Sequence, residues 1–114
     1  MQAPLDRAHF RHMTGGDLPL QREILALFCG QVDGWMALLV PGAHWRDAAH
    51  TLKGSARGIG LAALAEVCEA VETMANDDEL AATTLLRAAL EEALTAVQAY
   101  DDELAALTKA AAAR

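Results

Sequence analysis

A chain of 114 residues, 54% of them hydrophobic, is long enough for one compact domain around a single core. Only 4% of the residues are aromatic, and long β-branched runs are missing, so the composition favours an all-α fold over a sheet. The formal net charge of −7 argues against nonspecific nucleic-acid binding, which needs clustered lysine and arginine.

A short first helix is predicted over residues 5–13, followed by a longer second helix. Gly15 and Gly16 separate the two, Asp17 is a natural N-cap for the second, and Pro19 is tolerated in its first turn. The apolar residues of the second helix recur at steps of three and four, which predicts one buried face. They are Leu20, Ile24, Leu27, Phe28, Val32, Trp35, Leu38 and Leu39.

Three more helices are predicted before the C-terminal alanine tail. The third covers about residues 43–57, the fourth begins at Leu61, and the last begins near Glu79 after the closing sequence of residues 76–78. The last helix is expected to turn Leu80, Leu86, Leu90, Leu94, Val97, Leu104 and Leu107 inward. We therefore expect residues 1–114 to form one domain, an antiparallel four-helix bundle over about residues 17–109 with a short additional N-terminal helix.

The third helix carries the residues of greatest chemical interest. On a helical wheel of about 100° per residue, the buried stripe is formed by Trp45, Ala49, Leu52, Ala56 and Ile59. His50 lies about 140° from the centre of that stripe, which predicts an exposed imidazole. Lys53, Gly54 and Arg57 follow at i+3, i+4 and i+7, the positions beside one residue on a helix.

These neighbours suit an imidazole that reacts with an anionic group. Three cations against Asp47 make residues 43–60 basic on an otherwise acidic chain. Glycine inside a helix costs about 1 kcal/mol relative to alanine, and at Gly54 its missing Cβ would let another protein approach His50 closely. A neutral imidazole nitrogen is a nucleophile, and Lys53, with Arg57 added from helical geometry alone, would stabilise a phosphoryl group.

The segment His50-Thr-Leu-Lys53-Gly54-Ser55-Ala56, followed by Gly60-Leu61, resembles the signature of histidine-containing phosphotransfer (HPt) domains. Upstream, Gly16-Asp17 followed by Leu20, Leu25 and Phe28 is similar to the first bundle helix of that family, so the likeness extends over residues 5–107.

The resemblance implies that His50 accepts a phosphoryl group from one receiver-domain aspartate and gives it to another. It further implies that Lys53 assists the phosphoryl oxygens, that Gly54 gives clearance, and that Ser55 and Gly60 belong to the structural signature. The implied partners are response-regulator receiver domains and, through them, a hybrid sensor histidine kinase.

The chain is expected to be a phosphotransfer intermediate rather than an ATP-dependent kinase, because it has no G-x-x-x-x-G-K-[ST] loop. No cofactor or metal of its own is expected, since any Mg²⁺ would sit with the acidic residues of the receiver and Asp47 is the carboxylate expected near His50. Its apolar stretches, such as residues 35–40, are far shorter than the roughly 20 residues that cross a bilayer. Residues 1–14 have no secretory pattern, so we expect a cytoplasmic monomer without a membrane segment, although a dimer stays possible.

Two other functions remain open. The chain can be a docking bundle that binds receiver domains without phosphotransfer, or an enzyme for a small phosphorylated metabolite, which would require a concave pocket. His9 and His12 lack a third metal ligand and are interpreted as surface residues. Cys29 and Cys68 lack redox or zinc spacing and are interpreted as buried free thiols.

Overall fold

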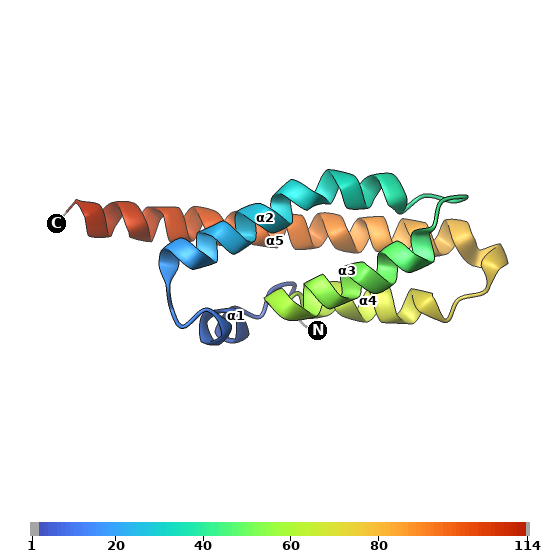
Figure 1. Cartoon of the computed structure of the whole chain (residues 1–114), viewed down its shortest axis with the longest axis horizontal. Helices are drawn as coiled ribbons and strands as arrows, with labels where there is room; N and C mark the ends of the chain where they lie inside the picture. The colour runs from blue at the N-terminus through green and yellow to red at the C-terminus, as the bar shows by residue number, and fades with distance from the viewer. Residues whose placement is uncertain (1–2, 114) are drawn as a thin grey trace.

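The computed structural model describes residues 3–113, and within them the only regular elements are helices. Four helices, α2 to α5, form an antiparallel bundle, and the short α1 lies across one end of it (Figure 1). This confirms the predicted all-α fold. The elements are α1 (Arg7–Met13), α2 (Leu18–Leu38), α3 (Trp45–Ile59), α4 (Ala62–Glu72), the 3₁₀ helix η1 (Asn76–Asp78) and α5 (Glu79–Ala112).

The first two helices begin where the sequence supplies a side-chain cap. The carboxylate of Asp6 accepts a hydrogen bond from the backbone N–H of His9, and that of Asp17 accepts from Leu20, each at 3.0 Å. Each cap satisfies one of the N–H groups that the first turn of a helix leaves without a partner. The predicted start of α1 therefore shifts by two residues, to Arg7 after the Asp6 cap. α3, which has no side-chain cap, runs from Trp45 to Ile59, two residues later than predicted.

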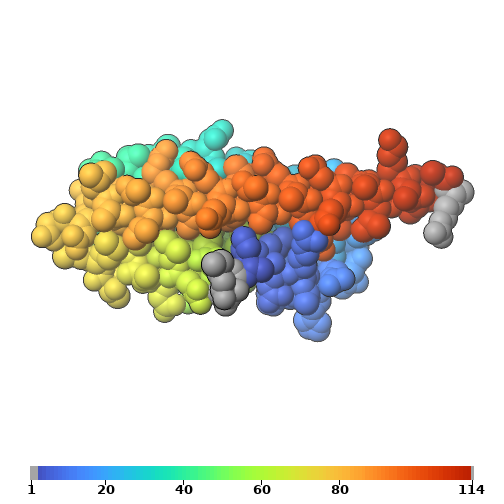
Figure 2. Space-filling view, turned by 180° about the vertical axis from the view of Figure 1, so that it is seen from behind, coloured from blue at the N-terminus to red at the C-terminus, as the bar shows by residue number. Residues whose placement is uncertain are grey.

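The longest helix, α5, holds the bundle together. At about 1.5 Å per residue its 34 residues extend about 51 Å, nearly the full 58 Å length of the molecule. Figure 2 shows α5 running along one whole face, with α1 and part of α4 beside it. α2 and α4 both pack on α5, and α3 packs extensively on α4 but only lightly on α2. None of the helices in residues 3–113 combines the length and apolar character that a bilayer-spanning segment requires.

Five leucines predicted to face inward are exposed instead. Leu80 lies at the start of α5 and Leu107 near its end, where the neighbouring helices leave α5 uncovered. On α2 the buried residues are Gln21, Leu25, Phe28 and Val32. Apolar residues spaced by three and four positions cover a wider sector of α2 than the neighbouring helices bury. Leu20, Leu27 and Leu38 lie at the exposed edge of that sector.

The N-terminal segment is fixed to the turn between α3 and α4. Leu5 and Phe10 are buried, and the backbone N–H of Asp6 donates to the carbonyl oxygen of Gly60 at 2.8 Å. Gly60 has a φ of +94°, a left-handed conformation that glycine adopts without the clash of a Cβ. The turn that follows the HPt-like motif therefore also anchors α1.

We expect Gly60→Ala to lower the free energy of unfolding by about 1–2 kcal/mol, because an L residue is strained in the left-handed region. A Cβ there would also lie 3.1 Å from the carbonyl oxygen of Asp6 and 3.1 Å from Cδ2 of His9. Gly58→Ala is the matched control, since its Cβ would meet nothing within 4 Å and alanine should stabilise α3 by up to about 1 kcal/mol. Urea unfolding followed by circular dichroism measures both. Equal stability of Gly60→Ala and wild type would contradict the close fit of α1 on this turn.

Candidate functional site

The amphipathic pattern of α3 sets the direction in which each candidate residue points. Trp45, Ala49, Leu52 and Ala56 are buried against the bundle, as the helical wheel predicts. His50 lies on the opposite side of α3, and its side chain is 74% exposed. The imidazole is therefore open to a partner molecule, while the helix that carries it is held by its buried stripe.

A single carboxylate, that of Glu72 near the end of α4, contacts both His50 and Lys53. Nδ1 of His50 lies 2.9 Å from Oε1 of Glu72, and Nζ of Lys53 lies 2.7 Å from Oε2. The Lys53 side chain is only 13% exposed and that of Glu72 22% exposed. The two α3 residues are thus connected through α4 rather than directly to each other.

Glu72 is ionised at neutral pH. The hydrogen bond from Lys53 lowers the pKa of the Glu72 carboxyl, and the bond to His50 adds to this effect against the opposing effect of burial. An ionised carboxylate accepts hydrogen bonds and cannot donate them. When the His50 ring is neutral, its proton is therefore on Nδ1, and the lone pair of Nε2 is free to act as a nucleophile.

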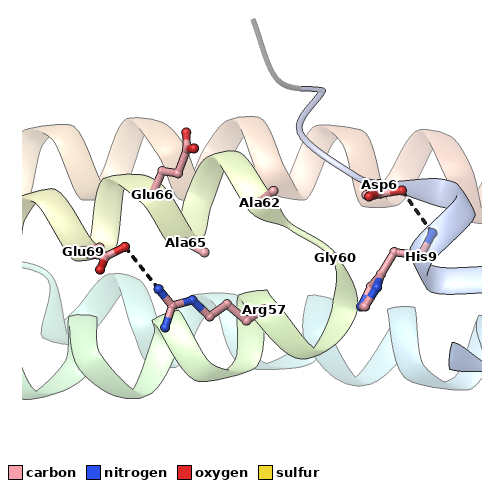
Figure 3. A pocket seen from close by; sticks show the side chains of 8 residues that line it. All are labelled: Asp6, His9, Arg57, Gly60, Ala62, Ala65, Glu66 and Glu69. Atoms are coloured by element: carbon pink, nitrogen blue, oxygen red, sulfur yellow. Dashed lines mark hydrogen bonds and ion pairs between the residues drawn. The ribbon is translucent and has the colours of Figure 1, made fainter.

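Arg57 does not join this group. Its Nη2 lies 3.1 Å from Oε2 of Glu69, one turn before Glu72 on α4. Figure 3 shows the Arg57 side chain extending toward Glu69 beside a surface hollow of about 290 Å³ that His9 and Gly60 also line. The geometry places Arg57 in an exposed ion pair, two helical turns from His50.

Arg46 fixes the end of α4 on which Glu72 lies. Its guanidinium donates to the backbone carbonyl oxygens of Glu72 and Met74 and, at 3.1 Å, to the side-chain oxygen of Asn76. Cations near the C-terminus of a helix satisfy carbonyl groups that lack helical partners. Arg46 therefore contributes to the position of Glu72 without contacting the His50 ring.

Gly54 lies on the exposed side of α3, next to His50. A Cβ at this position would meet no atom within 4 Å. The protein's own packing therefore does not require glycine here, which agrees with the predicted role of Gly54 in giving clearance to a partner.

The expectation that Asp47 would be the one carboxylate near His50 is wrong, because Glu72 is in direct contact. The basic segment 43–60 is also not a free positive surface, since Lys53 and Arg57 each pair with a glutamate of α4. Only part of the sequence signal for these pairs was available. Glu69 and Glu72 lie one turn apart on α4, and Lys53 and Arg57 lie one turn apart on α3, but the register that pairs them is not visible in the sequence.

The sequence profile of the Hpt domain family matches residues 43–100, slightly more than half of the chain. The chain belongs to this family. No curated protein and no solved structure matches it. The match covers α3 with the His50 segment, α4, and most of α5. Membership in the Hpt domain family implies a histidine phosphotransfer function in two-component signalling, and Hpt domains interact with receiver domains in phosphorelays.

The remaining candidate residues of this Hpt domain lie apart from His50. His9 and His12 are exposed on α1, and within residues 3–113 no three His, Cys, Asp or Glu side chains are grouped to hold a metal ion. Both thiols are free, Cys68 buried and Cys29 half-buried. Burial raises the pKa of the Cys68 thiol to about 11, so Cys68 is protonated at neutral pH and is not a competing nucleophile.

The lowered pKa of Glu72 predicts how the stability of the fold depends on pH. Ionised Glu72 stabilises the fold above the unfolded-chain pKa of about 4.3, and this contribution is lost as the pH falls through the lower folded-state value. The free energy of unfolding of wild type should therefore exceed that of Glu72→Gln by about 1 kcal/mol at pH 7. This difference should disappear at the acid end of the titration.

Urea unfolding between pH 7 and pH 3 measures this difference. Glu69→Gln is the matched control, because its ion pair with Arg57 is more than half exposed on both sides and should add little at any pH. A difference between wild type and Glu72→Gln that stays constant across this range would contradict the assigned ionisation.

Proposed function

We propose that this Hpt domain relays a phosphoryl group between receiver-domain aspartates through a phosphohistidine on Nε2 of His50. The observation that supports this proposal most strongly is the contact between Nδ1 of the exposed His50 and the ionised carboxylate of Glu72. It leaves the other ring nitrogen as a lone-pair donor facing solvent.

The transfer balances without loss of a proton from the site. The Nε2 lone pair attacks the phosphorus of an aspartyl phosphate, an N–P bond forms, and the P–O bond to the aspartate breaks with its electron pair leaving on the carboxylate. The imidazole ring keeps its Nδ1 proton and becomes positively charged, and Glu72 stabilises that charge. When the carboxylate of a second receiver attacks the phosphorus, the N–P bond breaks and its electron pair returns to Nε2.

Lys53 is the proposed cation for the phosphoryl oxygens. Its ammonium group and the His50 ring share the partner Glu72, and the four methylene groups of Lys53 let the ammonium swing from the carboxylate toward a new anion. Any Mg²⁺ needed for the transfer is assigned to the acidic residues of the receiver, and the chain itself is proposed to need no cofactor.

The first test is phosphoryl transfer from a panel of ³²P-labelled phospho-receivers, without nucleotide, to wild type and to His50→Gln. We expect acid-labile, alkali-stable label on wild type only, because a phosphoramidate hydrolyses in acid and resists base. Circular dichroism is the folding control. The spectrum of His50→Gln should match that of wild type, because the His50 side chain is exposed. Receiver binding without label on either protein would support the docking-only function instead.

The second test separates the two cations that the sequence places beside His50. Lys53→Met should lower the transfer rate constant about 10- to 100-fold, because a charge-assisted hydrogen bond is worth about 1.5–3 kcal/mol. Arg57→Ala should change it by less than about threefold, since Arg57 pairs with Glu69 in an exposed ion pair. Single-turnover kinetics at saturating phospho-receiver measures both, and a larger loss for Arg57→Ala would reverse the assignment.

A further inference from the structure

One edge of α3 carries a row of side chains that bond to α4 or to the residues just after it. The row consists of Arg46, His50, Lys53 and Arg57, at steps of four, three and four residues along one side of the helix. His50, Lys53 and Arg57 contact carboxylates of α4. Arg46 instead donates to two backbone carbonyl oxygens and one side-chain amide oxygen, so it holds the chain itself rather than a flexible side chain.

The end of α4 needs such a bond, because its own residues carry the wrong charge. Glu72 is the last residue of the helix, and its carbonyl group is among those that lack a partner within the helix. Glu69 and Glu72 also place negative charge at the end where the helix dipole is negative, and the last turn of α4 has no basic residue. Fraying of this turn would move the Glu72 carboxylate away from His50.

The guanidinium of Arg46 supplies the missing positive charge from the neighbouring helix. It donates to the carbonyl oxygens of Glu72 and, at 2.9 Å, of Met74, and to the side chain of Asn76 at 3.1 Å. It also lies 4.6 Å from the centre of the Trp45 ring, which attracts a cation and is itself buried in the core. Arg46 therefore connects the buried stripe of α3 to the end of α4.

Lys53 cannot hold Glu72 throughout the proposed relay. Its ammonium group bonds to Oε2 of Glu72 at 2.7 Å in the resting domain, but the relay assigns that group to the phosphoryl oxygens once the N–P bond has formed. The bonds of Arg46 go to the backbone, so they persist when Lys53 moves. The contact between Glu72 and Nδ1 of His50 then depends on Arg46.

We propose that Arg46 is a positioning residue for the phosphoryl transfer. It holds the end of α4 so that the Glu72 carboxylate keeps the proton on Nδ1 of His50 and leaves Nε2 unprotonated. This inference rests on the proposed function, since the tautomer of His50 matters for catalysis only when the ring is a nucleophile. Its first test measures the tautomer without any transfer, so the two proposals can fail separately.

The first measurement is the protonation of each ring nitrogen of His50, by ¹H–¹⁵N NMR of ¹⁵N-labelled protein in mildly alkaline buffer, where histidine rings are neutral. The signals that disappear in His50→Gln assign the ring. Wild type should be protonated on Nδ1. Arg46→Met keeps an unbranched apolar side chain but removes every donor, and it should show a mixture of both tautomers. A wild-type pattern in Arg46→Met would overturn the positioning role.

Arg87→Met is the matched control. Arg87 also donates to a backbone carbonyl oxygen of another helix, that of Met36 at 2.7 Å, but it joins α5 to α2. Both substitutions should lower the melting temperature by a few degrees, and Arg87→Met should keep the wild-type tautomer of His50. A mixture of tautomers in both variants would contradict the proposal, because loosening of the whole bundle would then account for it.

Phosphoryl transfer from a phospho-receiver that labels wild type measures the consequence for the reaction. Arg46→Met should lower the rate constant at saturation about 10- to 100-fold, since a displacement of about 1 Å at the reacting groups can cost about 100-fold. The half-saturating receiver concentration should stay near the wild-type value, and Arg87→Met should keep both quantities. A change confined to the half-saturating concentration would assign Arg46 to receiver binding instead.

The double variant Arg46→Met/Glu72→Gln tests whether Arg46 acts through Glu72. Once the carboxylate is gone, loss of Arg46 should add little, so the two losses of rate should not multiply. Losses that multiply would give Arg46 a separate role and overturn the proposal. Absence of label on wild type with every receiver overturns the proposed function, while the NMR comparison still decides whether Arg46 fixes the tautomer of the ring.

Discussion

The bridge from Glu72 to both His50 and Lys53 is the interaction on which the proposed chemistry of this domain depends. Without it, an imidazole on an exposed helix face would be free to rotate and to exchange between its two tautomers. The carboxylate holds Nδ1 at 2.9 Å and, in the relay that we propose, leaves Nε2 as the reactive atom. The proposed N–P bond would make the His50 ring cationic, so Glu72 would stabilise the intermediate more than the resting state.

The Glu72 carboxylate also restrains Lys53, which in the proposed relay has two anionic partners. In the resting domain Lys53 is 13% exposed and bonded to Glu72 at 2.7 Å. In the proposed relay a phosphoryl group on Nε2 would offer the ammonium a second anion, so Lys53 would be shared between Glu72 and the phosphoryl oxygens. A relay needs this balance, because a cation held too firmly by the phosphoryl group would slow its departure to the next aspartate.

The sequence predicts the features that depend on the apolar repeat within one helix and on its capping residues. The α3 stripe of Trp45, Ala49, Leu52 and Ala56, the exposure of His50, and the Asp17 cap all follow from residues within one or two turns of each other. The contact between Lys53 and Glu72 joins residues 19 apart through a turn, and its register becomes visible only when α3 and α4 are known to be paired. The exposed leucines of α2 escaped prediction for a related reason, because periodicity locates an apolar band but not the neighbours that cover it.

The two flanks of α3 meet opposite requirements of a transient partner. Toward α4 the helix is fixed by charge, with Arg46, Lys53 and Arg57 all bonded to groups on or just after α4. Toward α2 the packing is light and the side chains are small. In the proposed relay the ion pairs between α3 and α4 keep His50 in place. The small, uncharged residues Thr51, Ser55 and Gly58 on the other flank of α3 leave room for a partner. An interface with few contacts has a modest affinity, which in the proposed relay allows one receiver to leave before the next one binds.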